Sequence, residues 1–404
     1  MSIYRRLYVQ EKNFNHIILE PNLCYGCGAC VATCPKKCLK FEKDVLGFRR
    51  VQMAMEEDCV SCGKCSSVCP ISSCNKETDN VFRRFYGQIK NNKILMESSS
   101  GGAFSAISEL WIKNGGVVWG VSIDEDAKAS FICVDRIDNL YKIRGSKYVE
   151  VNQPMPFEFI KKQLNDGKKV LVSGVPCQIQ ALSSYLGRKY EKLLLVDLLC
   201  YGVQSPLIWE KYLSEINPQR KSINSIFMRY KVPGWENYAI KIEYKDGSSY
   251  IKSRWKDPYL LTYAKSLYNR ESCGNCRAKQ FPRISDITLG DFWQIDTVKK
   301  IPRDIKVNQG ISVILANSLK GQQIINDIQD SMKLFEIPEN TFSNMKARYS
   351  ECHSRSIMSE QFVKDTEKNG FSIAAHRMTN KRTLVKEWSR FRWLSFKRLI
   401  RRYS

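Results

Sequence analysis

The chain has 404 residues, and its 64 Lys and Arg against 41 Asp and Glu give a formal net charge of +23. This length allows two or three domains with a sizeable core. The chain has three histidines, a small number that argues against histidine-based zinc catalysis and Ser-His-Asp triads. No apolar run reaches the roughly 18 residues of a membrane span, and Met1–Asn15 lacks the apolar stretch of a signal peptide. We therefore expect a cytoplasmic protein whose sixteen cysteines are reduced and available for metal.

Two copies of the pattern C-x2-C-x2-C-x3-C-P lie 35 residues apart near the N terminus. In bacterial ferredoxins three thiolates on one tight loop bind one [4Fe–4S] cluster, and the fourth cysteine reaches the other cluster. We assign to the first cluster Cys24, Cys27, Cys30 and Cys69. We assign to the second cluster Cys34, Cys59, Cys62 and Cys65. A pair of zinc knuckles is the alternative interpretation.

The remaining half of the cysteines follows no ferredoxin motif. Cys38, Cys74 and Cys133 are expected to be small buried residues, and Cys352 is expected to be unliganded. Cys177 and Cys200 each follow a predicted strand, whereas Cys273 and Cys276 precede another. Because such loops can converge at one edge of a sheet, these four thiols suit a third [4Fe–4S] cluster or a four-thiolate zinc site. The third possibility is that they are unconnected core cysteines.

Beyond a polar, charged stretch, apolar runs of strand length alternate with helical segments. The predicted strands are Gly116–Ile123, Lys169–Ser173, Leu193–Leu199, Ile284–Leu289 and Ile311–Ala316. The predicted helices are Ala103–Lys113, Pro156–Leu164, Gln178–Leu186 and Leu319–Asp330. This alternation favours a mostly parallel sheet, and Tyr238–Tyr250 reads as an inserted hairpin.

The predicted fold class is α+β and α/β: a bacterial-type two-cluster ferredoxin fold followed by a mostly parallel α/β domain. We expect the ferredoxin domain at 15–78, a linker at 79–95, the α/β domain at 96–340, an extension at 341–376 and a basic tail at 377–404. The turn Ser98–Gly102 precedes a predicted helix. Its small residues and free N–H groups either hold a phosphate or simply cap the helix.

With these motifs the chain resembles the family of beta subunits of coenzyme F420 hydrogenases and dehydrogenases, in the branch with an N-terminal double ferredoxin. The matching stretches are Ser98–Phe104, Arg144–Val149, Gly174–Leu182, Leu199–Pro206 and Cys273–Trp293. The resemblance implies an FAD-containing α/β domain with its own [4Fe–4S] cluster on Cys177, Cys200, Cys273 and Cys276.

The resemblance also implies individual site residues. It implies that the loop binding the FAD pyrophosphate is formed by Ser98, Ser99, Ser100, Gly101 and Gly102. Lys147 becomes a candidate for pairing with the flavin or a phosphate, and a solvated surface lysine is the alternative. For Asp286 and Asp291 we prefer a structural role over proton transfer, and Trp235 either stacks on a substrate ring or packs.

Cluster binding combined with FAD favours a self-contained reductase that takes electrons from reduced ferredoxin and delivers them to an organic substrate. One alternative is an electron-input subunit that oxidises reduced coenzyme F420 for a partner hydrogenase or dehydrogenase. Another is a non-catalytic redox-sensing or scaffold module. The sequence does not identify the organic substrate.

The positive charge predicts an acidic partner, either an acidic redox protein, anionic lipid or nucleic acid. Residues 377–404 contain ten Lys or Arg and one acidic residue, interleaved with aromatic and aliphatic side chains. On a helical wheel the two classes separate imperfectly, which is typical of a helix that lies on an anionic membrane surface. The alternatives are a terminal helix packed on protein, which would need no membrane, and nucleic-acid binding, which we favour least.

Overall fold

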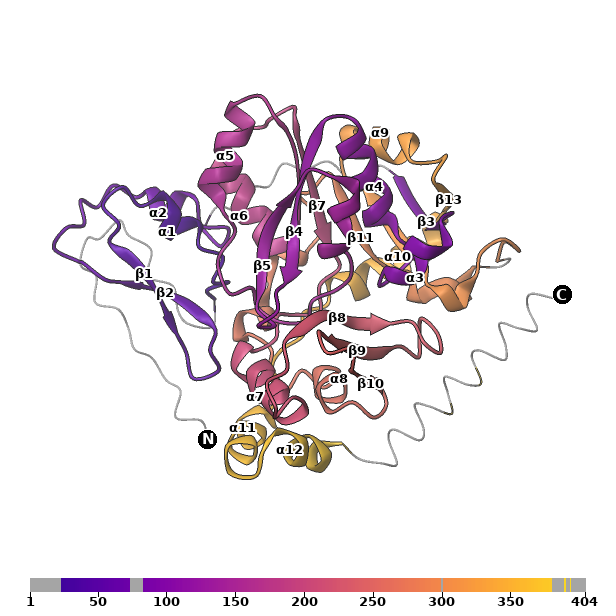
Figure 1. Ribbon diagram of the computed structural model, residues 1–404. Helices are drawn as coiled ribbons and strands as arrows, with labels where there is room; N and C mark the ends of the chain where they lie inside the picture. The colour runs from indigo at the N-terminus through magenta and orange to yellow at the C-terminus, as the bar shows by residue number, and fades with distance from the viewer. Residues whose placement is uncertain (1–22, 73–82, 299–300, 380–388, 390–392, 394–404) are drawn as a thin grey trace.

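The computed structural model describes residues 23–72, 83–298 and 301–379, together with residues 389 and 393. Figure 1 shows a small N-terminal module beside a larger α/β body, with a second, three-stranded sheet below the body. Most of the predicted tail 377–404, Cys74 and the start of the predicted domain 15–78 lie outside the described residues. No helix in the described ranges is long and apolar enough to cross a membrane.

The N-terminal module consists of two short helices and a hairpin. Its elements are α1 Ala29–Thr33, β1 Leu39–Lys43, β2 Arg49–Met53 and α2 Lys64–Ser67. Gly28 and Gly63 precede the two helices with φ of +88° and +69°, a left-handed backbone that favours glycine. β1 and β2 pair antiparallel. The module agrees with the ferredoxin-like domain that the two cysteine motifs predict.

An eight-stranded sheet forms the centre of the body. In spatial order its strands are β13 Met332–Glu336, β3 Arg83–Ile89, β12 Ser312–Ala316, β11 Ile287–Asp291, β7 Leu193–Leu198, β6 Lys169–Gly174, β4 Gly116–Ile123 and β5 Ala129–Val134. The four strands from β11 to β4 are parallel, and the remaining neighbours pair antiparallel. The prediction of a mostly parallel sheet is therefore wrong, because the sheet is mixed and only its centre is parallel.

The stretch predicted as a linker, 79–95, contains β3 and the first turn of α3 Asn92–Glu97. β3 lies between β13 and β12, and its residues from Phe85 to Ile89 are buried. The linker prediction is therefore wrong for residues 83–95. A second correction concerns Cys133, which lies on the edge strand β5 and is exposed, whereas Cys38 is buried as predicted.

Helices cover both faces of the central sheet. The four predicted ones are present as α4 Ala103–Lys113, α5 Phe157–Asn165, α6 Pro176–Leu186 and α9 Leu319–Asp327. Leu171 of β6 joins the core beneath α4 and α9, while its neighbours Val170 and Val172 join the core beneath α5 and α6. Ala29 and Val68 of the N-terminal module belong to the second of these cores. The module therefore packs on the face that carries α5 and α6.

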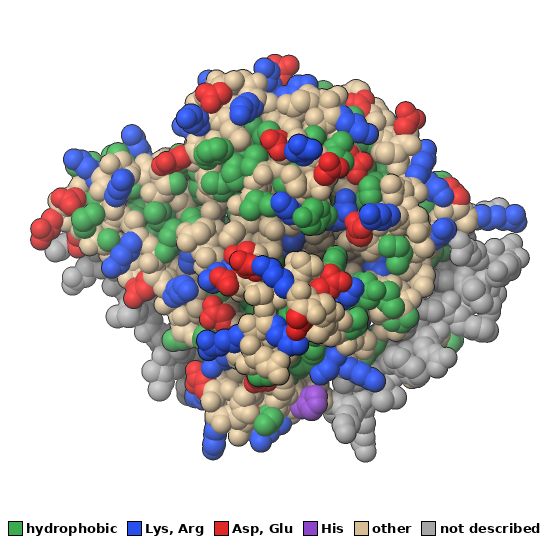
Figure 2. Space-filling view, in the orientation of Figure 1, with side chains coloured by type: hydrophobic (Ala, Val, Ile, Leu, Met, Phe, Trp, Pro, Cys, Tyr) green, Lys and Arg blue, Asp and Glu red, His purple; other side chains and the backbone are tan. Residues whose placement is uncertain are grey.

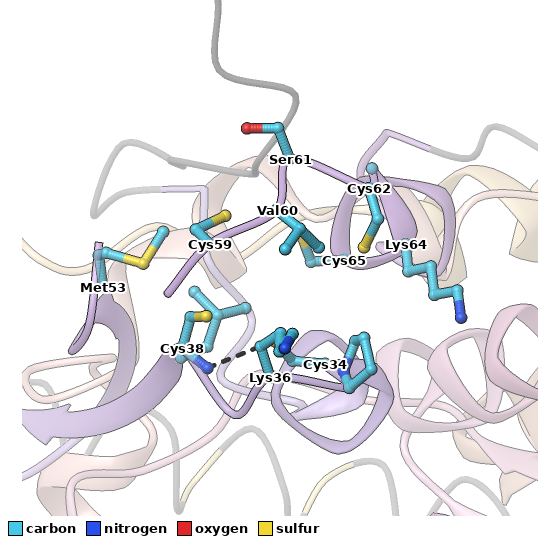
Figure 3. A pocket seen from close by; sticks show the side chains of 13 residues that line it. Cys34, Lys36, Cys38, Met53, Cys59, Val60, Ser61, Cys62, Lys64 and Cys65 are labelled. Atoms are coloured by element: carbon cyan, nitrogen blue, oxygen red, sulfur yellow. Dashed lines mark hydrogen bonds between the residues drawn. The ribbon is translucent and has the colours of Figure 1, made fainter. Parts of the chain in front are cut away.

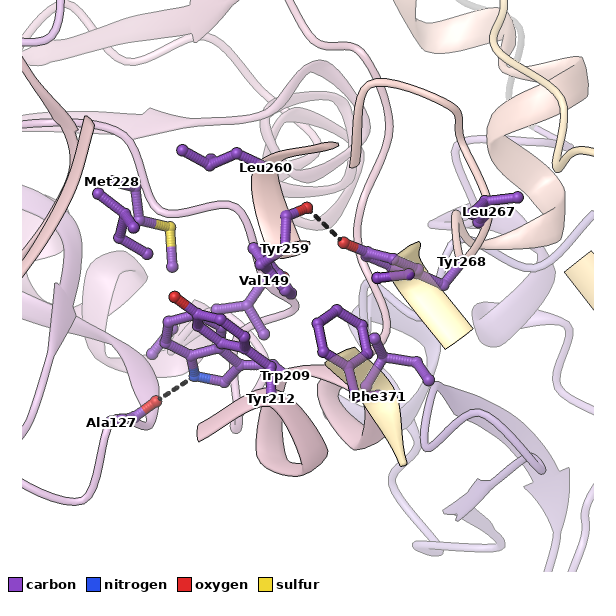
Figure 4. Packing of buried hydrophobic residues seen from close by; sticks show 14 of the residues in the cluster. Ala127, Val149, Trp209, Tyr212, Met228, Tyr259, Leu260, Leu267, Tyr268 and Phe371 are labelled. Carbon is purple, nitrogen blue, oxygen red and sulfur yellow. Dashed lines mark hydrogen bonds between the residues drawn. The ribbon is translucent and has the colours of Figure 1, made fainter. Parts of the chain in front are cut away.

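The second sheet contains the hairpin predicted at Tyr238–Tyr250. Its strands are β8 Ile223–Tyr230, β9 Ala239–Tyr244 and β10 Ser249–Ser253. Beside the second sheet lie α7 Pro206–Ile216, α8 Pro258–Tyr263, α11 Ser359–Asn369 and α12 Phe371–Met378. Figure 4 shows the aromatic core that joins these four helices, in which Trp209, Tyr212, Tyr259 and Phe371 are buried together. The helix α10 Glu339–Ser350 packs instead on the central sheet, in a core that it shares with β3 and β12.

Candidate iron–sulfur centres and cofactor cavity

The eight ferredoxin-motif cysteines gather into two sets, each around a small hollow. One hollow is lined by the predicted first-cluster ligands Cys24, Cys27, Cys30 and Cys69. The other is lined by the predicted second-cluster ligands Cys34, Cys59, Cys62 and Cys65. Figure 3 shows the second set, with Cys34 across the hollow from the other three. In the fold, the fourth cysteine of each motif therefore lies with the first three cysteines of the other motif, which is the grouping that the spacing predicts.

The backbone around these thiols also suits cluster binding. The N–H of Gly26 points at Cys24 Sγ at 3.4 Å, and the N–H of Cys38 points at Cys34 Sγ at 3.3 Å. N–H donors to sulfur stabilise a thiolate ligand and tune the potential of the cluster that it binds. In the described parts of the chain, no three His, Cys, Asp or Glu side chains converge closely enough for a single metal ion. Four thiols drawn from two such motifs, with N–H donors on their sulfurs, are the ligand set of a [4Fe–4S] cluster.

The four remaining predicted ligands come together at one edge of the parallel part of the sheet. Cys177 is in the first turn of α6 after β6, and Cys200 follows β7. Cys273 lies in the 3-10 helix η2 Glu271–Asn275, and Cys276 ends it. Burial, together with the neighbouring thiols Cys276, Cys200 and Cys273, raises the pKa of the Cys177 thiol well above its usual range. The other three thiols of the set are therefore close enough to act on Cys177.

This third set also has N–H donors on its sulfurs. Gly202 N–H donates to Cys200 Sγ at 3.3 Å, and Val203 N–H donates to Cys273 Sγ at 3.4 Å. The carboxyl ends of parallel strands β6 and β7 meet at this edge, which explains why two distant cysteines become neighbours. The donor set of four soft thiols fits a third [4Fe–4S] cluster.

A cavity of about 690 Å³ lies beside the third set. Its wall includes the Ser98–Gly102 turn, the Arg144–Val149 stretch, Cys177 and Cys200, and it extends to Cys27 of the first-cluster set. Its volume is within the range of small-molecule and cofactor sites. One cavity therefore contacts two predicted clusters and the predicted phosphate turn.

The phosphate turn is held from several sides. Gly102 has φ of +84°, and α4 begins at the next residue. Its first three residues, Ala103, Phe104 and Ser105, line the cavity, so the N-terminus of the helix lies in the cavity wall. Ser99 Oγ accepts the N–H of Ser146 at 2.8 Å. Gly101 has no room for a side chain, since a Cβ there would lie 2.2 Å from the carbonyl oxygen of Gly87. The turn is thus built of small residues that pack closely against β3 and the Arg144–Val149 stretch.

Two segments of the chain match known family models. Residues 167–340 match the model for the C terminus of the coenzyme F420 hydrogenase/dehydrogenase beta subunit, and residues 23–73 match a 4Fe-4S dicluster domain. Over residues 167–340 the chain belongs to the family of coenzyme F420 hydrogenase/dehydrogenase beta subunits. With its 4Fe-4S dicluster domain, it is an iron–sulfur electron-transfer protein related to subunits of F420 hydrogenases and dehydrogenases, which are oxidoreductases.

Two relatives of this family member illustrate the likeness. One of the subunits of the F(420)H(2) dehydrogenase of Methanosarcina mazei is 21% identical over 336 residues, which is 80% of this chain and 87% of the relative. Among solved structures, a chain of the F420-reducing [NiFe] hydrogenase complex from Methanosarcina barkeri is 14% identical with a TM-score of 0.47. That likeness covers 72% of this chain and 94% of the other.

In this family member Lys147 is half-buried in the cavity wall. Its ammonium donates to the carbonyl oxygens of Arg144 at 2.8 Å and Gly145 at 3.1 Å. Burial and then the charge of Arg144 lower the pKa of Lys147 to about 7. This position differs from that of a solvated surface lysine and suits a contact with an anionic cofactor.

The remaining sequence candidates have structural roles here. Asp286 accepts hydrogen bonds from the N–H of Leu195 at 2.9 Å and from Ser318 Oγ at 2.6 Å, so it fixes the start of β11. Trp235 is fully buried and stacks on Trp293 with 4.4 Å between ring centroids, so it packs. Asp291 differs, because it lines the cavity while pairing with Arg229 and accepting from Trp235 Nε1.

Several cavity residues of this family member escaped the sequence reasoning. Tyr201 stacks on His353, and Tyr148 stacks on Tyr263, each pair with 4.6 Å between ring centroids. All four line the cavity, and they give it an aromatic wall. Lys231 lies beneath the phosphate turn, where its ammonium donates to the carbonyl oxygens of Leu95, Ser100 and Gln309. Tyr148 and Tyr201 lie in the matching stretches Arg144–Val149 and Leu199–Pro206, and Tyr201 directly follows Cys200, whereas nothing in the sequence marks the others.

Proposed function

We propose that the chain is a ferredoxin-dependent flavoprotein reductase, which passes electrons through three [4Fe–4S] clusters to FAD and on to an organic substrate. The observation that carries the proposal is the single cavity that contacts Cys27, the Cys177 and Cys200 pair, and the Ser98–Gly102 turn. FAD would supply the conversion between one-electron and two-electron chemistry. FAD can accept single electrons from the clusters only if it is bound close to them, and this cavity lies beside two of the predicted clusters.

The residues of the chain account for binding of such a cofactor. The N-terminal N–H groups of α4 and the nearby Lys147 offer positive charge to a diphosphate. The aromatic wall offers flat surfaces to ring systems, through Tyr148, Tyr201, Tyr263 and His353. Asp291 pairs with Arg229 in the same wall, so both charged groups line the space that a bound molecule would occupy.

The test is anaerobic purification with reconstitution, followed by iron counting, FAD extraction and reduction by ferredoxin. We expect about twelve irons and one FAD per chain. Reduction by an acidic ferredoxin should slow steeply as salt is added, because Lys and Arg outnumber acidic residues. Figure 2 shows these cations scattered among acidic residues over the visible face. A reconstituted chain without flavin would overturn the proposal and favour the redox-sensing or scaffold module.

The likeness to one of the subunits of an F(420)H(2) dehydrogenase favours a second candidate, an electron-input subunit that oxidises reduced coenzyme F420. The two candidates differ in electron donor and in partner. Bleaching of the clusters by reduced coenzyme F420, together with co-purification of a large catalytic subunit, would support the second. Bleaching by ferredoxin alone in the isolated chain would support the first.

For the basic tail at 377–404 we propose attachment to the cytoplasmic face of an anionic membrane. The test compares the full chain with a truncation ending at Met378 by flotation with anionic and neutral liposomes. We expect the full chain to float with anionic liposomes at low salt and the truncation to stay in the soluble fraction. If both stay soluble, the tail has another role.

A further inference from the structure

Arg270 connects the first-cluster loop to the third-cluster loop by hydrogen bonds at both ends. Its carbonyl oxygen accepts the N–H of Cys273 at 3.1 Å, within the third set. Its Nη1 lies 3.4 Å from the carbonyl oxygen of Cys24, in the first set, and donates to the carbonyl oxygen of Arg49 at 2.9 Å. A single residue therefore spans the junction between the N-terminal module and the body.

The guanidinium of Arg270 is buried at this junction and has charged partners. The side chain is 5% exposed and forms an ion pair with Glu150. The same carboxylate lies 3.5 Å from Nη2 of Arg49 and accepts the N–H of Arg49 through its other oxygen at 3.3 Å. Arg270 also lies over the ring of Phe48, 4.7 Å from its centroid. Two arginines share one carboxylate, so these three largely buried side chains, which also lie in the cavity wall, carry a net positive charge.

A second contact crosses the same junction in the opposite direction. Tyr25 lies between two ligands of the first set, and its hydroxyl accepts the N–H of Arg277, next to Cys276 of the third set, at 3.0 Å. Gly26 leaves space for Arg270, because a Cβ there would lie 2.7 Å from Nη2. The first and third sets are therefore neighbours. The second set belongs to the more exposed side of the module, where Cys62 is exposed.

We propose that Arg270 is a positioning residue for electron transfer between the first and third clusters: it fixes their two loops against each other and provides the positive charge between them. A [4Fe–4S] cluster on four thiolates is an anion, and it gains one negative charge on reduction. A buried cation beside two such clusters stabilises the reduced form of each and raises both potentials. One electron then passes between neighbours without any change in covalent bonds. This inference rests on the proposed third cluster.

The test is a redox titration of the reconstituted chain, followed by electron paramagnetic resonance. Cys62→Ser and Cys273→Ser variants assign the signals to the second and third clusters. Arg270→Gln removes the charge, so we expect the potentials of the first and third clusters to fall while that of the second stays unchanged. Glu150→Gln leaves the arginine charge uncompensated, and we expect the same two potentials to rise. These opposite shifts would not arise from a general loosening of the fold.

Two further variants complete the comparison. Arg270→Lys keeps the positive charge but lacks the planar guanidinium that reaches the carbonyl oxygens of Cys24 and Arg49. We therefore expect near-normal potentials and an altered magnetic interaction between the reduced clusters. Arg84→Gln is the control, because Arg84 on β3 pairs with Glu339 away from the junction, and it should shift none of the potentials. If Arg270→Gln fails to retain iron, Glu150→Gln and Arg270→Lys still decide the matter.

The outcomes separate the inference from the function on which it rests. About eight irons per chain would overturn the third cluster and with it the coupling. About twelve irons, with first-cluster and third-cluster potentials that move no more than the second-cluster potential, would overturn the role of Arg270 alone.

Discussion

The Ser99 hydroxyl accepts a hydrogen bond from the N–H of Ser146 at 2.8 Å, and it thereby joins the phosphate turn to the stretch that carries Lys147. The two segments are 47 residues apart in the chain. Between them they line one side of the cavity, together with the start of α4. An anionic cofactor bound there would contact both segments at once.

This contact gives a sharp test of the FAD site. In Ser99→Asp the new carboxylate can still accept the Ser146 N–H, but it adds negative charge where a diphosphate would lie. We expect FAD content to fall at least tenfold while iron content and melting temperature stay close to normal. Ser99→Asn is the matched control, since it has nearly the same shape without the charge. Equal flavin content in the two variants would show that the diphosphate binds elsewhere.

The third cluster can be tested by counting iron. Cys273→Ser removes one of the four thiols, and we expect iron to fall from about twelve to about eight per chain after reconstitution. Cys352→Ser is the control, because Cys352 lies next to the site, with Sγ 3.4 Å from the carbonyl oxygen of Cys276, yet is outside the predicted ligand set. Loss of iron in the Cys352 variant, with none in the Cys273 variant, would reassign the ligand.

The sequence was most informative where the chemistry is local. Each ferredoxin motif keeps its cysteines within eleven residues, so spacing alone predicts the crosswise grouping around the two hollows. The helices α4, α5, α6 and α9 were likewise predicted from local periodicity. The convergence of Cys177 and Cys200 follows from the rule that the carboxyl ends of parallel strands share an edge, whereas the Cys273–Cys276 pair precedes β11 and lies outside this rule.

What the sequence missed depends on distant partners. β3 looked like a linker because Arg83, Arg84 and Gln88 are polar, but the buried Gln88 amide donates to the carbonyl oxygens of residues 306 and 310 at 2.8 and 2.6 Å. Strand direction was misjudged because an apolar run does not reveal it. Among the described residues between β11 and β12 there is no α-helix, as antiparallel neighbours allow. Arg270 and Lys231 carry no sequence signal, since their partners come from separate segments.

Lys231 gives a stability prediction. Its buried ammonium donates to three carbonyl oxygens, of Leu95, Ser100 and Gln309, at 2.5 to 2.6 Å. Lys231→Met would leave these acceptors without a donor, so we expect the free energy of unfolding to fall by about 2–4 kcal/mol and flavin to be lost with it. Lys252→Met, on the exposed edge strand β10, should change stability by less than about 0.5 kcal/mol. Denaturant unfolding of the apoprotein measures both.

Lys147 gives a pH prediction for FAD binding. Burial and the charge of Arg144 hold its pKa at about 7 in the protein without cofactor, so the amine is largely neutral above that pH. A bound diphosphate would favour the ammonium and raise the pKa, and binding above pH 7 would therefore take up a proton. FAD affinity should therefore be constant below about pH 7 and should fall above it, by at most about tenfold per pH unit. Fluorescence titration of apoprotein with FAD from pH 6 to pH 9 measures the slope. Lys147→Met should bind more weakly at pH 6 and show a flat profile, whereas an unchanged slope in that variant would assign the pH dependence to another group.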